Sequence, residues 1–225
     1  MTKPRIALFD LDHTLLPIDS DYSWGEFTQQ IGWTDPVDFK RRNDRFYADY
    51  VAGTLDVHDY VRFAVEAVRL RGRAAYEEAH RQFMRDWIEP VRENALALVR
   101  GHQDAGDTVA IVTATNELVT RPIADAFGVQ ELIAVELQRD GSGWITGDIA
   151  GVPSMREGKV VRVADWLHAR GLDWDTVETT FYSDSMNDIS LLERVDHPVA
   201  TNPDDRLRAL AQERGWRILD LFPRA

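Results

Sequence analysis

The hydrophobic pattern divides the chain into a short apolar strand, a long helical stretch and a region of alternating strands and helices. A buried strand is predicted at Arg5-Ile6-Ala7-Leu8-Phe9, where a short apolar run ends in acidic residues. From residue 18 to residue 90, aromatic and aliphatic side chains recur at three- and four-residue spacing, which predicts helices almost throughout. One such row consists of Tyr60, Phe63, Ala64 and Ala67.

Local signals divide the helical stretch. A first helix is predicted at Tyr22 to Ile31, and Asp35-Pro36 is typical of a helix start with Pro at the first helical position. Gly53 and Gly72 indicate breaks between helices.

Beyond residue 91, segments with the hydrophobic spacing of strands alternate with segments that have the spacing of helices. Strands are predicted at 108–112, 132–138, 144–149, 179–183, 198–201 and 216–219, and helices at 94–102, 117–127, 159–170, 187–194 and 204–214. Asp140-Gly141-Ser142-Gly143 is a hairpin signal. The alternation predicts an α/β fold with a Rossmann-like, doubly wound parallel sheet.

The domain division follows from where the helical stretch interrupts this pattern. Residues 1–17 and 91–225 are expected to form the α/β core, and residues 18–90 an all-helical cap. The cap should lie over the carboxyl edge of the sheet, where open α/β sheets bind ligands.

Composition excludes several classes of protein. The formal net charge of −12 disfavours nucleic-acid or anionic-membrane partners. The chain contains no cysteine, which excludes thiolate metal sites and suits a cytoplasmic protein. No apolar stretch approaches the length of a membrane span, and the N-terminal apolar run is too short for a signal peptide.

Paired carboxylates follow the first strand, in Phe9-Asp10-Leu11-Asp12-His13-Thr14-Leu15-Leu16. Positions i and i+2 share a face of an extended strand, so Asp10 and Asp12 can converge on one ligand or metal ion. Mg²⁺ prefers carboxylate oxygens, and one carboxylate can act as a nucleophile while its neighbour transfers protons. The alternative is that both acids only end the strand as turn residues.

Two further strand-to-helix junctions carry groups that suit a phosphate. Thr113 follows a buried strand and precedes a helix, so its hydroxyl and the amides after it could hold a phosphate, or these residues could only cap the helix. Lys159 opens another helix, where the helix dipole favours anions. That conflict is typical of a functional lysine, although a solvated lysine would also explain it.

A second acidic strand end occurs in Phe181-Tyr182-Ser183-Asp184-Ser185-Met186-Asn187-Asp188. Asp184 could complete a magnesium site with Asp10, and Asp188 is better placed to orient a metal-bound water. A turn followed by a helix rich in Asp at its N-terminus is the alternative. Because the carboxyl ends of parallel strands meet at one edge of a sheet, the four junctions together favour a common site over coincidence.

The four junctions resemble the motifs of the haloacid dehalogenase (HAD) superfamily of phosphohydrolases. They are matched in order by Asp10-Leu11-Asp12-His13-Thr14, by Thr113, by Lys159, and by Asp184 with Asp188, over nearly the whole chain. The helical insertion is similar to the family's type 1 cap. The segment from Asp184 to Asp188 is similar to the phosphoserine-phosphatase-like branch, subfamily IB.

The resemblance implies a catalytic role for each motif. Asp10 would attack phosphorus and become phosphorylated, and Asp12 would protonate the leaving alcohol and then activate water. Thr113 and Lys159 would bind the phosphoryl oxygens. Mg²⁺ would be held by Asp10, Asp184 and the main-chain carbonyl of Asp12, and with the lysine it would supply the positive charge that the chain as a whole lacks.

Other residues of the motifs would complete the site. Asn187 and Asp188 would support the surroundings of the metal and the lysine, while Thr14, Ala114 and Thr115 would contact the substrate. The function expected from the resemblance is Mg²⁺-dependent hydrolysis of a small phosphorylated metabolite.

Substrate choice depends on residues just after the first motif. In this branch an acidic residue near the position of Asp19 binds the substrate's amine, and Asp21 is close by; both could instead cap the first cap helix. Phosphoserine and histidinol phosphate would both satisfy such an acid. The segment Thr113-Ala114-Thr115 departs from the Ser-Gly-Gly usual in phosphoserine phosphatases. The segment from Asp19 to Phe27 is also more aromatic than expected for so small a substrate, and it is more similar to the histidinol-phosphatase-type members of this branch. Trp24 and Phe27 could stack on an imidazole or pack as a helix face.

Three other functions stay open at this point. A phosphomutase would use the same nucleophile and a similar cap. A phospho-accepting signalling domain would combine the same residue types, although an inserted cap is foreign to it. A non-catalytic binding protein could share the fold, because fold alone does not imply activity.

Overall fold

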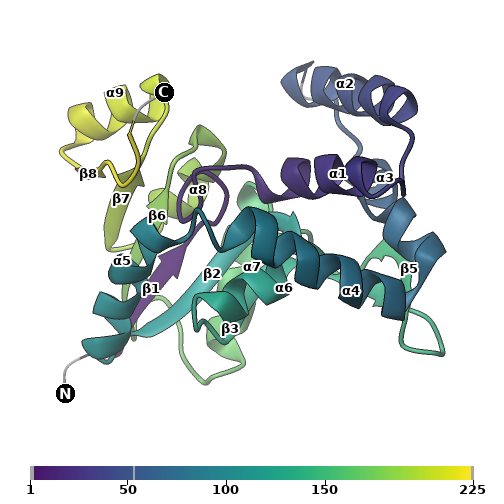
Figure 1. Ribbon diagram of the computed structural model, residues 1–225. Coiled ribbons are helices and arrows are strands. Elements are labelled where there is room, and N and C mark those ends of the chain that lie inside the picture. The colour runs from purple at the N-terminus through teal and green to yellow at the C-terminus, as the bar shows by residue number, and fades with distance from the viewer. Residues whose placement is uncertain (1–2, 53, 224–225) are drawn as a thin grey trace.

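A six-stranded parallel sheet forms the centre of the computed structural model, which describes residues 3–52 and 54–223 (Figure 1). Its order is β3-β2-β1-β6-β7-β8. These strands are β1 (Arg5–Phe9), β2 (Thr108–Asn116), β3 (Glu131–Val135), β6 (Glu178–Ser183), β7 (His197–Thr201) and β8 (Arg217–Leu219). Every neighbouring pair in this sheet is parallel, which confirms the predicted doubly wound α/β fold.

The apolar run of β1 fills both faces of the sheet. Ala7 and Phe9 pack into one hydrophobic cluster, and Ile6 and Leu8 pack into a second. Successive strand side chains point to opposite faces, so a strand buried on both sides reads as a continuous apolar run rather than an alternating one. The sequence of β1 is therefore that of a central strand.

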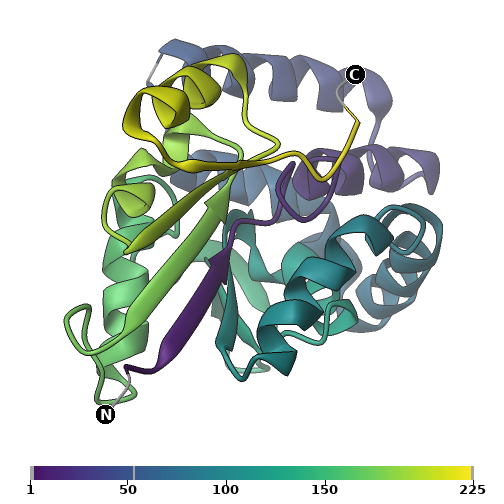
Figure 2. The same cartoon turned by 90° about the vertical axis from the view of Figure 1, so that its left-hand side faces the viewer.

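Helices cover both faces, as Figure 2 shows. Those of the α/β region are α5 (Glu93–Asp104), α6 (Glu117–Ala126), α7 (Glu157–His168), α8 (Ile189–Leu192) and α9 (Asp205–Arg214). Apolar side chains of α5 and α6 join the cluster of Phe9, and those of α7, α8 and α9 join the cluster of Leu8. This is the two-sided covering that parallel sheets require.

The helical stretch contains α1 (Ser20–Gln30), α2 (Pro36–Ala52), α3 (Val57–Arg71) and α4 (Arg73–Phe83), followed by a π-helical turn at Met84–Ile88. Asp35 accepts hydrogen bonds from the amides of Val37 and Asp38, which confirms the predicted helix start. Gly72 separates α3 from α4 at φ +80°, a conformation that glycine adopts without strain. The break predicted at Gly53 lies outside the described residues.

Residues 132–138 differ from the single strand predicted there. The chain leaves the main sheet after Val135 and starts β4 (Leu137–Arg139), which pairs antiparallel with β5 (Ile145–Ile149). The apolar and polar residues of Val135-Glu136-Leu137-Gln138 alternate as in a continuing strand, so the sequence pattern does not show the change of partner. The Asp140 side chain accepts from the amides of Ser142 and Trp144, which builds the predicted hairpin turn.

This hairpin packs against α3 of the helical stretch. Arg62 of α3 forms an ion pair with Asp148 at 2.8 Å, and the Trp144 indole donates to the Arg69 carbonyl.

The predicted helix at 187–194 also differs from the structure, because it begins as a 3₁₀ turn at Met186–Asp188 before the short α8. Among the described residues, no helix has both the length and the apolar character needed to span a membrane.

Helix α4 lies along α6 rather than over the edge of the sheet. The Tyr76 hydroxyl donates to the Leu118 carbonyl at 2.6 Å, and the His80 Nε2 lies 3.1 Å from the Val119 carbonyl oxygen. His80 is buried and its ring stacks on Trp24 of α1. Burial lowers the pKa of His80 from 6.5 to about 4.

The buried imidazole gives stability a pH dependence. Because the folded-state pKa of His80 lies below its unfolded value, the contribution of the neutral ring is complete above pH 6.5 and is lost as pH falls towards 4. Between pH 7 and pH 4.5, the free energy of unfolding should fall by on the order of 2 kcal/mol more in the wild type than in His80→Gln, whose amide can still donate to Val119 but does not titrate. Urea denaturation at the two pH values measures this difference, and equal losses in the two proteins would contradict it.

Candidate active site

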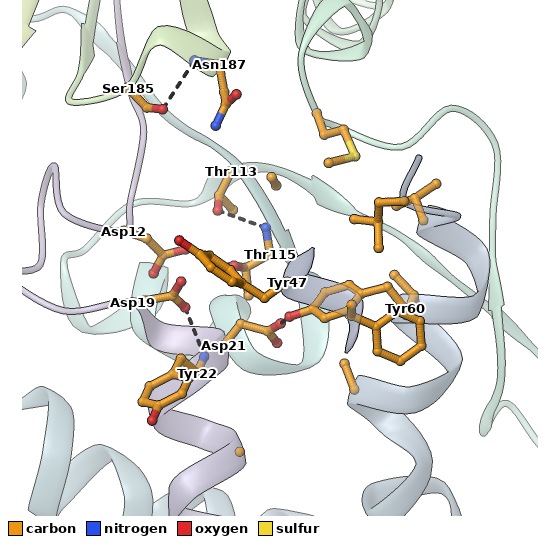
Figure 3. A pocket seen from close by; sticks show the side chains of 18 of the residues that line it. Asp12, Asp19, Asp21, Tyr22, Tyr47, Tyr60, Thr113, Thr115, Ser185 and Asn187 are labelled. Atoms are coloured by element: carbon orange, nitrogen blue, oxygen red, sulfur yellow. Dashed lines mark hydrogen bonds between the residues drawn. The ribbon is translucent and has the colours of Figure 1, made fainter. Parts of the chain in front are cut away.

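The four sequence motifs meet at the carboxyl edge of the sheet. The register of β1 with β6 pairs Phe9 with Tyr182, and the amide of Asp10 donates to the Tyr182 carbonyl at 2.9 Å. The acids that follow the two strands are thereby brought together. A cavity of about 400 Å³ opens there and extends under α1, α2 and α3 (Figure 3).

Lys159 is the centre of this cluster. Its ammonium lies 2.9 Å from Asp10 and 2.7 Å from Asp188, and all three side chains are almost completely buried. Burial alone would lower the pKa of Lys159, but the charges of Asp10 and Asp188 and their hydrogen bonds outweigh it, so the net shift is upward. The lysine is therefore a fixed positive charge.

The backbone before Lys159 passes closely over the preceding loop. A Cβ on Gly158 would lie 2.1 Å from the carbonyl oxygen of Pro153, a distance no side chain can occupy. Glycine at this position lets α7 begin where its third residue, Lys159, points at Asp10. The unfavourable place of a lysine at a helix start is thus explained by its two acidic partners.

Asp12 is held apart from the lysine by two donors. One carboxylate oxygen accepts from the Ser20 amide at 2.7 Å, and the other from the Thr115 hydroxyl at 2.8 Å. Burial, helped by the charge of Asp19, raises the pKa of Asp12 to about 7 although these hydrogen bonds oppose the shift. The carboxyl group is oriented towards the cavity that it lines.

Thr14 joins the first motif to the fourth. Its hydroxyl donates to Asp184 at 3.1 Å and accepts from the Asp184 amide at 3.0 Å. Thr14 is fully buried, and the preceding His13 has φ +56°. The Asn202 amide group donates to the carbonyls of His13 and Thr14, which holds this left-handed turn in place.

The fourth motif is ordered by serine hydroxyls. Ser183 donates to Asp188 at 2.7 Å and accepts from the amide of Ser185. Ser185 in turn accepts from the amide of Asn187 (Figure 3). Asp188 is therefore fixed from one side by Ser183 and from the other by Lys159.

The carboxylates of the two acidic strand ends are crowded. Burial raises the pKa of Asp10 to about 7 against the opposing charge of Lys159, with the charges of Asp188 and Asp12 adding to the rise. Burial and the charge of Asp10 raise the pKa of Asp184 to about 7 as well. Such crowding shows that more negative charge gathers here than Lys159 alone balances.

The donor set at this point fits a hard divalent cation. The predicted ligands are the carboxylates of Asp10 and Asp184 and the main-chain carbonyl of Asp12, all oxygen donors of the kind that Mg²⁺ binds while keeping several waters. In the part of the chain that the structure describes, no group of three or more His, Cys, Asp or Glu side chains is arranged to hold a metal. The predicted set contains only two such side chains and is compatible with that finding.

The structure brings most of the predicted site residues to the cavity wall. The members of the set that line it are Asp10, Asp12, Asp19, Thr113, Ala114, Thr115, Lys159, Asp184, Asn187 and Asp188. Thr14 is not among these lining residues, and its hydroxyl is engaged with Asp184. Thr113 is buried, and its oxygen accepts from the Thr115 amide at 3.1 Å.

Asp19 has the capping role that sequence left as an alternative. Its carboxylate accepts from the Tyr22 amide at 2.9 Å and starts α1, yet the residue also lines the cavity (Figure 3). Trp24 and Phe27 are buried against Phe83 and His80 instead, so they form a helix face. The aromatic rings that do line the cavity belong to Tyr22, Phe39, Phe46, Tyr47, Tyr60 and Phe63.

Sequence reasoning missed several residues around the site. Ser20 and Ser183 orient Asp12 and Asp188, and Asn202 holds the turn after Asp12. Ser183 stands directly before Asp184 at a strand end, which was a usable signal. Asn202 follows a different strand, and only the sheet order brings it to His13.

The chain is similar in sequence and in structure to known proteins along most of its length. A sequence profile of the haloacid dehalogenase-like hydrolases matches residues 7–193. A histidinol-phosphatase of Neisseria meningitidis serogroup C is 37% identical over 218 residues, covering 96% of this chain and 98% of the relative. A Bordetella pertussis protein of unknown function has a crystal structure with a TM-score of 0.92 and 49% identity, covering 98% of this chain and 100% of that one.

A more distant likeness concerns the fold. A substrate-bound phosphoserine phosphatase has a TM-score of 0.62 at 18% identity, covering 97% of this chain and 94% of that chain. The profile match, the relative along the whole chain and the four motifs at one sheet edge lead to the same conclusion. The chain belongs to the haloacid dehalogenase-like hydrolases and is a phosphatase of the phosphoserine-phosphatase-like group.

Proposed function

We propose that the protein hydrolyses a small, amine-bearing phosphomonoester through a phospho-aspartate intermediate on Asp10, with Mg²⁺ as cofactor. One observation carries the proposal. Lys159 contacts Asp10 at 2.9 Å on the wall of a cavity that Asp12, fixed by two donors, also lines. A nucleophile, a charge for the phosphoryl group and a separate acid stand at one end of a single chamber.

Asp10 is the proposed nucleophile. Its carboxylate lines the cavity at the end of β1, and its backbone is fixed to Tyr182 of the neighbouring strand. Attack by one carboxylate oxygen on phosphorus would form the acyl phosphate and release the substrate alcohol. Phosphoryl transfer depends mainly on positioning and charge neutralisation, which a rigid strand end and a buried lysine provide.

Asp12 is the proposed acid and base. Its two hydrogen bonds, from Ser20 and Thr115, hold the carboxyl group within the same cavity as Asp10 but away from Lys159. In the first half-reaction it would give its proton to the leaving oxygen. In the second it would take a proton from the water that attacks the acyl phosphate and frees Asp10.

The remaining polar groups of the site would hold the phosphoryl oxygens and Mg²⁺. Thr113, the amides of Ala114 and Thr115, and Lys159 are the proposed phosphoryl contacts, while Thr14, bonded to Asp184, is better suited to positioning that carboxylate than to touching substrate. Asp10, Asp184 and the carbonyl of Asp12 would hold Mg²⁺. When bound, the cation would neutralise charge on the transferring group.

The domain division is part of the same proposal. Residues 1–17 and 91–225 would act as the core that carries the four motifs, and residues 18–90 as a cap that closes the chamber. Side chains of α1, α2 and α3 line the cavity opposite the catalytic acids. Closure of such a cap would exclude bulk water while the phosphoryl group is transferred to Asp10.

Histidinol phosphate is the first candidate substrate, and phosphoserine is the second. The relative that matches along its whole length is named a histidinol-phosphatase. Both esters carry an amine that Asp19 would meet, since this carboxylate lines the cavity near Asp12 and raises the pKa of that residue.

The nucleophile is tested by Asp10→Asn, which keeps the shape of the side chain. Turnover of p-nitrophenyl phosphate, measured as kcat/KM, should fall by about 10³-fold or more because the amide cannot form the acyl phosphate. Circular dichroism and urea unfolding should show an intact fold. Substantial residual turnover by the pure variant would rule out Asp10 as the nucleophile.

The amine contact is tested by Asp19→Asn. The asparagine removes the charge but can still accept the Tyr22 amide and cap α1, whereas Asp19→Ala loses both. Loss of a charge-assisted hydrogen bond should raise the KM for phosphoserine and histidinol phosphate by about tenfold or more, with little change for p-nitrophenyl phosphate. Equal effects on all three esters would show that Asp19 has only a structural role.

A further inference from the structure

A second carboxylate, Asp21, faces the same cavity from the first turn of α1. The Tyr60 hydroxyl of α3 donates to one of its oxygens (Figure 3). The Asn116 amide group lies 3.4 Å from the other. Neither the catalytic steps nor the proposed metal site uses this residue. Its place at the cavity wall calls for a separate explanation.

Both neighbours of Asp21 are fixed, neutral donors. The Asn116 side-chain oxygen caps α6 by accepting from the amides of Leu118 and Val119, which turns its NH₂ group towards Asp21. Burial, with the charge of Asp21, raises the pKa of Tyr60 well above its usual value, so the phenol stays protonated. Two neutral donors orient the carboxylate without balancing its charge.

No cationic side chain pairs with Asp21 among the residues that the structure describes. Lys159 also lines the cavity, but its ammonium is already bonded to Asp10 and Asp188. Burial and the nearby charge of Asp19 raise the pKa of Asp21 to about 6, so the group is mainly ionised at neutral pH. A half-buried carboxylate without a paired cation is stabilised by a cation or by further N–H donors.

Aromatic rings enclose the space in front of Asp21. Phe46 and Tyr47 of α2 and Tyr60 and Phe63 of α3 line the cavity, and the rings of Phe46 and Tyr60 lie 5.6 Å apart edge to face. Flat apolar walls of this kind favour a planar group, and their π faces attract a cation. A simple alkyl ammonium offers these walls a cation but no flat surface to pack against them.

The two cavity carboxylates outside the catalytic cluster lie at different places. Asp19 is close enough to Asp12 to raise that residue's pKa, whereas Asp21 is bonded to Tyr60 of the aromatic wall. A substrate with a single basic group needs only one of them. Two carboxylates fit a substrate with a basic group near the phosphate and a second one farther from it.

We propose that Asp21 selects the distal part of the substrate, by accepting a hydrogen bond from the N–H of a planar basic ring that packs against Phe46 and Tyr60. The ester would be derived from an amino alcohol that carries an imidazole-like ring. This inference rests on the proposed phosphatase function and adds a residue and a ligand chemistry to it.

The test compares three esters in the wild type and in Asp21→Asn, with Mg²⁺ present. Histidinol phosphate carries an amine and a ring, O-phosphoethanolamine carries only an amine, and p-nitrophenyl phosphate carries no basic group. In the variant, kcat/KM for histidinol phosphate should fall by about tenfold or more, and the values for the other two esters should change by less than about twofold.

Two matched variants separate binding from structure. Asp19→Asn should weaken both amine-bearing esters, with or without the ring. Phe46→Leu keeps an apolar side chain in the wall but removes the ring, so it should weaken histidinol phosphate alone. Urea unfolding of each variant establishes that it is folded, and Phe46→Leu still tests the idea if Asp21→Asn does not fold.

The outcomes distinguish the two levels of the proposal. Wild-type protein that turns over none of the esters would overturn the phosphatase proposal itself. Wild-type protein that hydrolyses p-nitrophenyl phosphate, combined with Asp21→Asn effects that are equal for all esters or absent, would overturn only the role of Asp21. Equal wild-type kcat/KM for histidinol phosphate and O-phosphoethanolamine would overturn it as well.

Discussion

The buried ion pair network of Lys159 with Asp10 and Asp188 is the interaction on which the site depends. An ammonium almost completely removed from water is tolerable only when it is paired and hydrogen-bonded, and here two carboxylates satisfy it at 2.9 and 2.7 Å. The network joins the ends of β1 and β6 to the start of α7. Removing the charge of one acid would leave Lys159 with a single carboxylate partner, so the contacts that would position the reacting groups also stabilise the local fold.

Charge also explains how an acidic protein can accept a phosphate ester. The chain has a formal net charge of −12, and the cavity itself is lined by Asp10, Asp12, Asp19 and Asp21 among others. Lys159 and a divalent cation at the strand ends would balance the phosphoryl group. Asp19 and Asp21, which also line the cavity, would then favour a substrate whose other groups are basic. The negative charge of the cavity would thereby help to select the substrate.

The sequence predicted the sheet edge well because its signals are local. Apolar strands that end in Asp10, Thr113 and Asp184 are visible in the pattern, and the parallel sheet places such ends together. The sequence could not show the split of residues 132–138 between two sheets, because the alternation Val135-Glu136-Leu137-Gln138 is also that of a strand that continues. It also could not show that Asp21 meets Tyr60 and Asn116, which lie 39 and 95 residues away, since that contact depends on how α1 packs against α3 and α6.

The central claim is metal-dependent hydrolysis of a small phosphomonoester, and phosphate release from a panel of esters tests it most directly. The panel should include histidinol phosphate, phosphoserine and several sugar phosphates, each with Mg²⁺ and with a chelator in excess. Turnover that requires Mg²⁺ and clearly prefers histidinol phosphate is the predicted result. Turnover that is unchanged by the chelator, or folded protein that releases phosphate from no ester, would contradict the claim.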